Sequence, residues 1–106
     1  WGLASCEAAS APYSIWPAAR GSAARHPCTE NYPNNADSWL VAGPLDFSDA
    51  TQAELSFDYL LKTEKNKDWF GWYASDDNIS FSGIRESGDS NGWSNNTFDL
   101  QQWVGK

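Results

Sequence analysis

The segment Asp68–Ser75 (DWFGWYAS) carries the side chains best suited to binding a ligand, because four of its eight residues are aromatic. Alternation along a strand would divide it into two faces, with Phe70, Trp72 and Ala74 on one and Trp69, Gly71 and Tyr73 on the other. If the first face is core, Trp69 and Tyr73 stand outward on either side of a glycine that has no side chain. Two such rings are suited to stacking on sugar rings, or to anchoring a protein interface. The alternative is a strand covered on both faces, with all four aromatic residues in the core.

Acidic residues in two predicted turns indicate a candidate calcium site. Asp76-Asp77-Asn78 forms one cluster, and Asp46 with Asp49 forms the other. Calcium prefers oxygen ligands of this kind carried on turns, and no EF-hand spacing is present. The alternative is that these carboxylates are solvated turn residues.

A catalytic interpretation has little support. The loop Gly88–Gly92 (GDSNG) resembles the nucleophile loop of a serine protease, but such a serine needs a histidine base and an orienting acid. The one histidine, His26, lies in a proline-flanked loop without a local signature. No predicted cleft brings two of the 14 acidic residues together for glycoside hydrolysis. We therefore expect the chain not to be an enzyme.

The two cysteines, Cys6 and Cys28, lie in a stretch rich in Ala, Ser and Pro. A metal site is disfavoured because there is no CxxC pair. Two unrelated buried thiols are the remaining alternative, in a segment with few residues to bury them. We predict a disulfide, which indicates an oxidising compartment and hence an extracellular or cell-surface location.

Composition narrows the class of protein further. The 106 residues suffice for one domain. A net charge of -7 argues against a nucleic-acid partner, since phosphate affinity comes mainly from cationic side chains. No apolar run reaches the roughly 18 residues of a membrane span. Seven Trp, four Tyr and five Phe argue against disorder.

The elements that must position these residues are strands. The composition of residues 1–36 predicts irregular structure with one or two short strands, around Tyr13–Trp16. The pattern of residues 37–106 predicts a strand-rich core. The strand-like runs are Ser38–Ala42, Glu54–Leu61, Asp68–Ser75, Ile79–Ile84 and Trp93–Leu100. Asn91-Gly92 predicts a turn with positive φ. Short strands at this spacing without an amphipathic helix predict an all-β fold, an antiparallel β-sandwich of jelly-roll type.

A family resemblance emerges from the order of several short motifs. These are Gly21-Ser22-Ala23-Ala24, Asp37-Ser38-Trp39-Leu40-Val41, Gly43-Pro44-Leu45-Asp46-Phe47-Ser48, Ala53–Phe57, Asp68–Ser75 with Asp77, and Trp93 with Phe98-Asp99-Leu100. Over about residues 21–100 the chain resembles the MAM-related jelly-roll modules of secreted bacterial proteins. These include accessory domains of immune-inhibitor-A-type metallopeptidases, cleaved adhesins and choice-of-anchor proteins. The resemblance implies a structural calcium site in some members.

The chain departs from that family in two ways. It lacks the opening strand that ends in Phe-Glu, and it has no closing strands after Gly105-Lys106. We therefore expect an incomplete jelly roll, completed either by a longer chain or by β-augmentation from a partner, which is a second copy or a strand-donating protein. The predicted function is a non-catalytic extracellular binding and assembly module, such as a subunit of a surface or filamentous structure. The alternative is a carbohydrate-binding accessory domain of a secreted enzyme. Two sequons, at Asn78 and Asn95, add candidate glycosylation sites.

Overall fold

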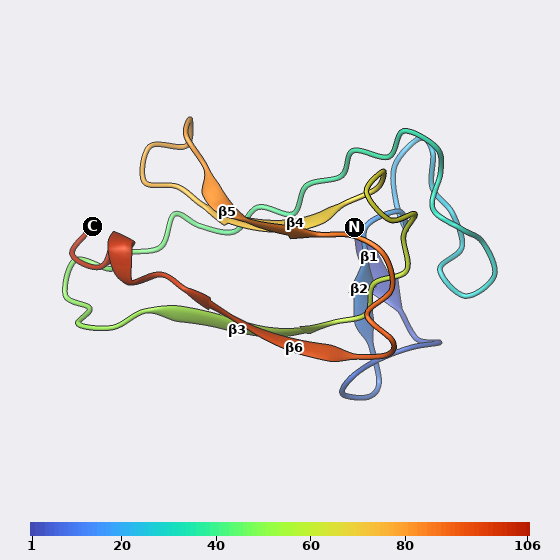
Figure 1. Ribbon diagram of the computed structural model, residues 1–106, viewed down its shortest axis with the longest axis horizontal. Helices are drawn as coiled ribbons and strands as arrows, with labels where there is room; N and C mark the ends of the chain where they lie inside the picture. Colours follow the sequence, from blue (N-terminus) through green and yellow to red (C-terminus); the bar gives the residue numbers. More distant parts are fainter. The chain divides into compact units, whose positions relative to one another are not determined.

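The computed structural model describes all 106 residues, and the chain divides into two compact units, Trp1–Pro44 and Leu45–Lys106. The chain forms six strands, β1 to β6, followed by one short 3-10 helix, η1, and Figure 1 labels the strands. Every strand pair is antiparallel, and each sheet has two strands. The predicted all-β class is confirmed. None of the helical segments has the length and hydrophobicity needed to cross a bilayer.

The first unit contains little regular structure. β1 (Gly2–Ala4) and β2 (Ser14–Trp16) form an antiparallel ribbon of three residues per strand. β2 confirms the short strand predicted around Tyr13–Trp16, and β1 is a second short strand whose position was not predicted. The buried apolar side chains of this unit are two alanines, Ala4 and Ala18. A core this small cannot contribute much to the stability of the unit, because an alanine buries little apolar area.

The strand predicted over Ser38–Ala42 is absent, and this prediction is wrong. No strand lies between Trp16 and Glu54. Trp39, Leu40 and Val41 are 62%, 59% and 73% exposed. Their apolar side chains suit a strand, but strand propensity is expressed only where a neighbouring strand accepts the backbone hydrogen bonds.

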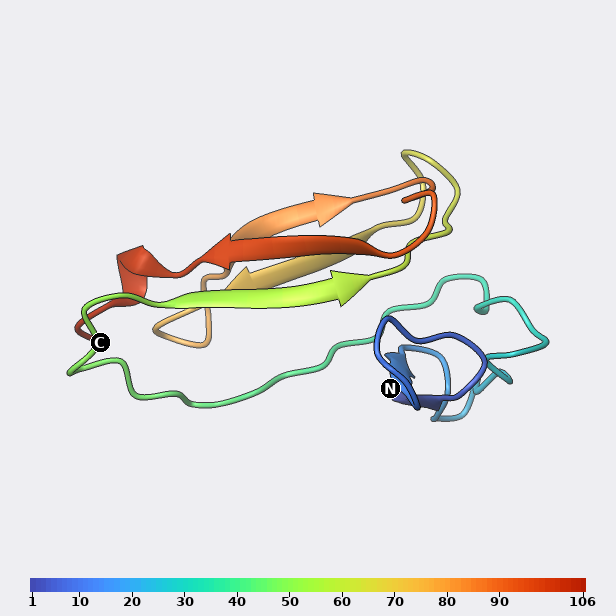
Figure 2. The same cartoon turned by 90° about the horizontal axis from the view of Figure 1, so that it is seen from below.

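The second unit is built from two ribbons. β3 (Glu54–Tyr59) pairs with β6 (Ser94–Asp99), and β4 (Phe70–Ala74) pairs with β5 (Ser82–Glu86). Figure 1 shows that the β4–β5 ribbon faces the β3–β6 ribbon, and Figure 2 shows η1 (Gln101–Trp103) directly after β6. The runs predicted at 54–61, 68–75 and 93–100 thus each contain a strand, which is two or three residues shorter than predicted. The two ribbons do not join into a closed sheet, so only the coarser all-β statement is confirmed.

Aromatic residues fill the space between the two ribbons. The buried cluster consists of Trp72 from β4, Phe98 from β6 and Trp103 from η1. Phe57 of β3 meets Trp72 edge-on, with ring centroids 5.2 Å apart at 72°, a favoured geometry for aromatic pairs. Phe70 and Ala74 pack against the same cluster. The face predicted to be core is therefore confirmed, and Trp69, Gly71 and Tyr73 belong to the opposite face.

The turns explain where the later strands begin. Asn91 and Gly92 have φ values of 57° and 103°, as predicted for a turn that requires positive φ. The strand predicted over Ile79–Ile84 instead begins at Ser82. The carboxylate of Asp77 accepts hydrogen bonds from the N–H groups of Ile79 and Ser80, which keeps these amides in the turn and out of a ladder.

Candidate functional site

The outward face of the β4–β5 ribbon consists of Trp69, Gly71, Tyr73, Gly83 and Arg85. The pairing places Gly71 opposite Arg85 and Tyr73 opposite Gly83. Residues that lie opposite each other in an antiparallel pair share a face. Trp69 and Tyr73 are 42% and 40% exposed. The structure therefore brings the three predicted ligand or interface residues to one face, and adds Arg85 and Gly83.

The space over Gly71 is filled by the ring of Tyr73. A Cβ atom on Gly71 would lie within 2.6 Å of Cε2 of Tyr73, and one on Gly83 would lie 2.8 Å from Cδ1 of the same ring. The expectation that Trp69 and Tyr73 both stand outward, with open space over Gly71 between them, is therefore wrong. Because both glycines lack side chains, the Tyr73 ring lies across the ribbon instead of standing away from it.

The second aromatic residue of this face is stacked with a cation. The guanidinium carbon of Arg85 lies 4.0 Å from the ring centroid of Trp69, well within the range of a cation–π interaction. Sequence reasoning missed Arg85, because its place opposite Gly71 depends on where β5 begins. A search for the one arginine in the hairpin partner of the aromatic strand would have found it.

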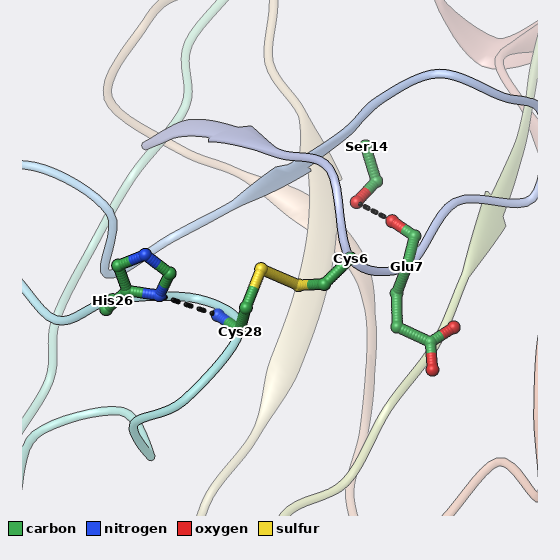
Figure 3. Close-up of a disulfide and its surroundings, with 5 residues drawn as sticks. All are labelled: Cys6, Glu7, Ser14, His26 and Cys28. Atoms are coloured by element: carbon green, nitrogen blue, oxygen red, sulfur yellow. Dashed lines mark hydrogen bonds between the residues drawn. A yellow bond between two sulfur atoms is a disulfide. The ribbon is translucent and has the colours of Figure 1, made fainter.

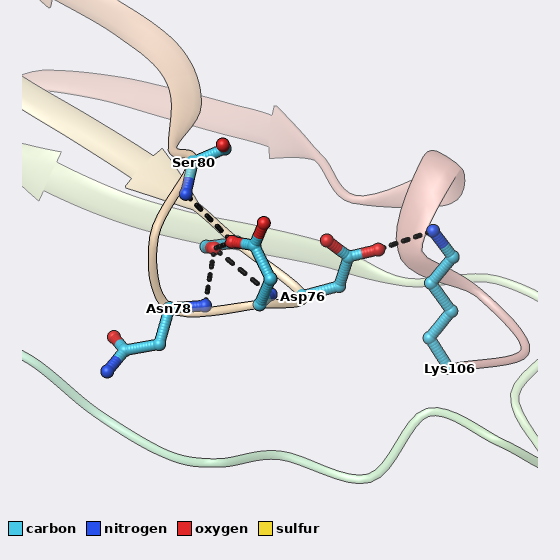
Figure 4. A network of polar contacts seen from close by, with 6 residues as sticks. Asp76, Asn78, Ser80 and Lys106 are labelled. Atoms are coloured by element: carbon cyan, nitrogen blue, oxygen red, sulfur yellow. Dashed lines mark hydrogen bonds and ion pairs between the residues drawn. The ribbon is translucent and has the colours of Figure 1, made fainter.

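The candidate calcium ligands Asp76 and Asp77 both make contacts within the protein, and Figure 4 shows the ion pair of Asp76. Asp77 accepts the N–H groups of Ser80 and Ile79 at 2.7 Å and 2.8 Å, and these bonds lower its pKa. Asp76 forms an ion pair with Lys106 at 2.5 Å, and the hydrogen bond from Lys106 lowers the pKa of Asp76. The carboxylate of Asp77 thus stabilises the turn, and that of Asp76 joins the turn to the side chain of Lys106.

Asp46 has a similar local role. It accepts the N–H of Ser48 at 2.9 Å, and the hydroxyl and N–H of Ser48 lower the pKa of Asp46. No group of three or more His, Cys, Asp and Glu side chains is arranged to hold a metal ion. Calcium binding at Asp46, Asp76 or Asp77 stays a prediction.

The disulfide between Cys6 and Cys28 is present (Figure 3). His26 lies beside it and accepts the N–H of Cys28 through Nδ1 at 3.2 Å. The N–H of His26 donates to Glu30 Oε2. These contacts shape the loop around the disulfide, and the disulfide prediction is confirmed.

Ser90 has a structural role in the second unit. Its hydroxyl accepts the N–H of Leu61 at 2.9 Å and donates to the carbonyl of Gly92 at 2.6 Å. It therefore joins the loop after β3 to the turn before β6.

The two sequon asparagines differ in their surroundings. Asn78 has a φ of 58° and sits in the exposed turn after β4. The side-chain amide of Asn95 donates to the carbonyl of Phe57 and to Asp58. Modification of Asn95 would have to replace these two hydrogen bonds, whereas that of Asn78 would not.

Comparisons with known proteins give no further assignment. No family model matches the chain, and searches of curated proteins and of solved structures found no match. The resemblance to MAM-related jelly-roll modules therefore stays a prediction.

Proposed function

We propose that this chain is a non-catalytic extracellular binding and assembly module that associates with other protein chains through strand pairing and aromatic contacts. The observation that carries the proposal is the openness of the second unit. Each of its sheets has only two strands, and all five residues of β5 are exposed. A strand with a free edge offers unpaired N–H and C=O groups to another chain.

Apolar side chains at the open side of this unit support the same conclusion. Ile84 is paired with Trp72, and therefore points toward the other ribbon, yet it remains 51% exposed. A groove of about 260 Å³ lies beside it, lined by β5, the end of β6 and η1. Covering the exposed half of Ile84 would contribute about 1 kcal/mol. An added strand would also satisfy the free backbone groups of β5 and would extend the β4–β5 sheet, as the interpretation of an incomplete jelly roll requires.

Two variants of matched chemistry test this proposal. Ile84→Lys places a charge on the inward side of β5, which discourages edge pairing. Ile79→Lys makes the same change in the exposed turn, where Ile79 is 83% exposed. Light scattering should show an oligomer for the native chain and Ile79→Lys, and a monomer for Ile84→Lys. A native chain that is a well-folded monomer would overturn the proposal.

The extracellular location is supported by the disulfide. A bond between Cys6 and Cys28 persists in oxidising compartments and is rare in reducing ones. Detection of the reduced form of both cysteines in protein taken from its native source would contradict this location.

Carbohydrate binding is the second candidate function, and it would make the chain an accessory domain of a secreted enzyme. It is favoured by one observation, the half-exposed rings of Trp69 and Tyr73 on the same face. Binding to a glycan array should be lost in Trp69→Ala. Glycan binding that survives this change would remove the face from consideration.

Calcium is proposed as a structural ion at Asp46 or at the Asp76–Asn78 turn. If calcium is held there, adding EGTA should lower the melting temperature, and calcium should restore it. An unchanged melting temperature would eliminate the proposed ion.

A further inference from the structure

Arg85 is the cation on the outward face of the β4–β5 ribbon, and no carboxylate neutralises it. The two ion pairs of the structure, Lys67–Glu64 and Lys106–Asp76, lie elsewhere. Stacking on Trp69 is the one interaction of its guanidinium. The N–H groups of Arg85 are therefore available to an external acceptor.

The surroundings of Arg85 are unusual for such an acidic chain. The protein has 14 acidic and 7 basic residues, yet the outward positions around Arg85 are aromatic or glycine. The neighbouring Glu86 pairs with Phe70 and belongs to the inward side. This face is thus a local positive site on a protein whose net charge is -7, and it is not part of a general cationic surface.

The stack prepares Arg85 for one kind of ligand group. A guanidinium stacked on an aromatic ring keeps its N–H donors in a plane that a carboxylate can meet with two parallel hydrogen bonds. Because Trp69 already restricts the side chain, less conformational entropy is lost on binding. Trp69 is 42% exposed although Arg85 stacks on its ring, so this residue still offers apolar surface to a ligand.

We propose that this face binds a hexuronic-acid sugar, with Arg85 binding the carboxylate and Trp69 contacting the sugar ring. The inference rests on the carbohydrate-binding candidate above and names its ligand class. In a hexuronate the carboxylate is bonded to the ring, so one sugar residue supplies both groups at short range. In an acidic peptide, by contrast, the carboxylate sits on a flexible side chain with no ring beside it.

The test uses one polymer in two forms, polygalacturonate and its methyl ester. The ester keeps the sugar rings and removes the negative charge. Isothermal titration should show that the full chain binds polygalacturonate about 10- to 100-fold more tightly than the ester, as expected for hydrogen bonds to a charged group. General attraction does not explain such a preference, because the protein and the polymer are both acidic.

Three variants assign the effect to the stacked arginine. Arg85→Gln should abolish the preference for the acid form, and Arg85→Lys should recover only part of it, since lysine lacks the two-pronged geometry. Arg20→Gln removes an exposed arginine of the first unit that is not stacked on a ring, and should change nothing. Near-UV circular dichroism of each variant would check that its aromatic packing is unchanged.

The outcomes separate this inference from the functions on which it rests. Equal binding of acid and ester that is lost in Trp69→Ala would retain sugar binding and overturn the role of Arg85. Failure to bind polygalacturonate, or tighter binding of polyglutamate, would overturn the hexuronate assignment. The oligomeric state measured by light scattering reports on the assembly function independently of both.

Discussion

Replacing Cys6 and Cys28 together by alanine should unfold the first unit and leave the second unit folded. The disulfide joins residues 22 apart in sequence. Restricting the unfolded chain over such a loop contributes about 3 kcal/mol. The other contributions to this unit are small, because it has one three-residue ribbon and its buried apolar side chains are Ala4 and Ala18.

The expected loss can be measured as an equilibrium constant. A change of about 3 kcal/mol lowers the ratio of folded to unfolded first unit by about 100-fold. Amide hydrogen exchange by NMR reads this ratio separately in β1–β2 and in β3–β6. Protection should collapse in the first ribbon and stay unchanged in the second. Treating the native protein with a reducing agent should give the same result without any substitution.

Two results would refute the reasoning. Unchanged protection of β1 and β2 in the double variant would mean that contacts other than the disulfide hold the first unit. An equal loss of protection in β3 and β6 would mean that the two units do not fold independently.

Three further predictions concern the second unit. Trp72→Ala should lower the free energy of unfolding by about 3–5 kcal/mol in urea. Trp72→Phe should lower it far less, because the buried indole N–H has no hydrogen-bond partner to lose. Equal losses of stability in the two variants would contradict this. Gly83→Ala should disrupt the β4–β5 ribbon, as measured by circular dichroism, because its Cβ would lie 1.9 Å from the carbonyl oxygen of Trp72. Gly71→Ala is the milder control, since its Cβ would meet only the side chain of Tyr73, which can move. A Gly83→Ala protein that stays stable would refute this prediction. Because the pKa of Asp77 is lowered, its ionised form stabilises the turn at pH above the ordinary value of 3.8. This stabilisation should be lost as pH falls through the lowered pKa, and the turn amides should then exchange faster. Unaltered exchange of these amides would exclude a stabilising role for the Asp77 carboxylate.

Much of the second unit was predictable because its strands alternate strongly. Leu55, Phe57 and Tyr59 mark one face of β3, and Phe70 with Trp72 marks the core face of β4. Period-two alternation follows from strand geometry alone and needs no knowledge of the partner strand. The turn at Asn91-Gly92 was equally local.

Other predictions failed because they depended on distant partners. Ser38–Ala42 has the composition of a strand, but strand formation requires a neighbour that the sequence does not specify. The start of β5 was misplaced because the side chain of Asp77 holds the amides of Ile79 and Ser80. Such side-chain competition for backbone groups leaves no mark on a hydrophobic pattern.

The features of the candidate site likewise fall into those that depend on local sequence and those that depend on distant partners. The sequence by itself determined that Trp69, Gly71 and Tyr73 share a face and that Cys6 and Cys28 form a disulfide. Only the tertiary structure decided that the Tyr73 ring lies across two glycines and that Arg85 stacks on Trp69. Alternation acts between residues near in sequence, whereas these contacts depend on the register between β4 and β5, which the turn connecting them sets.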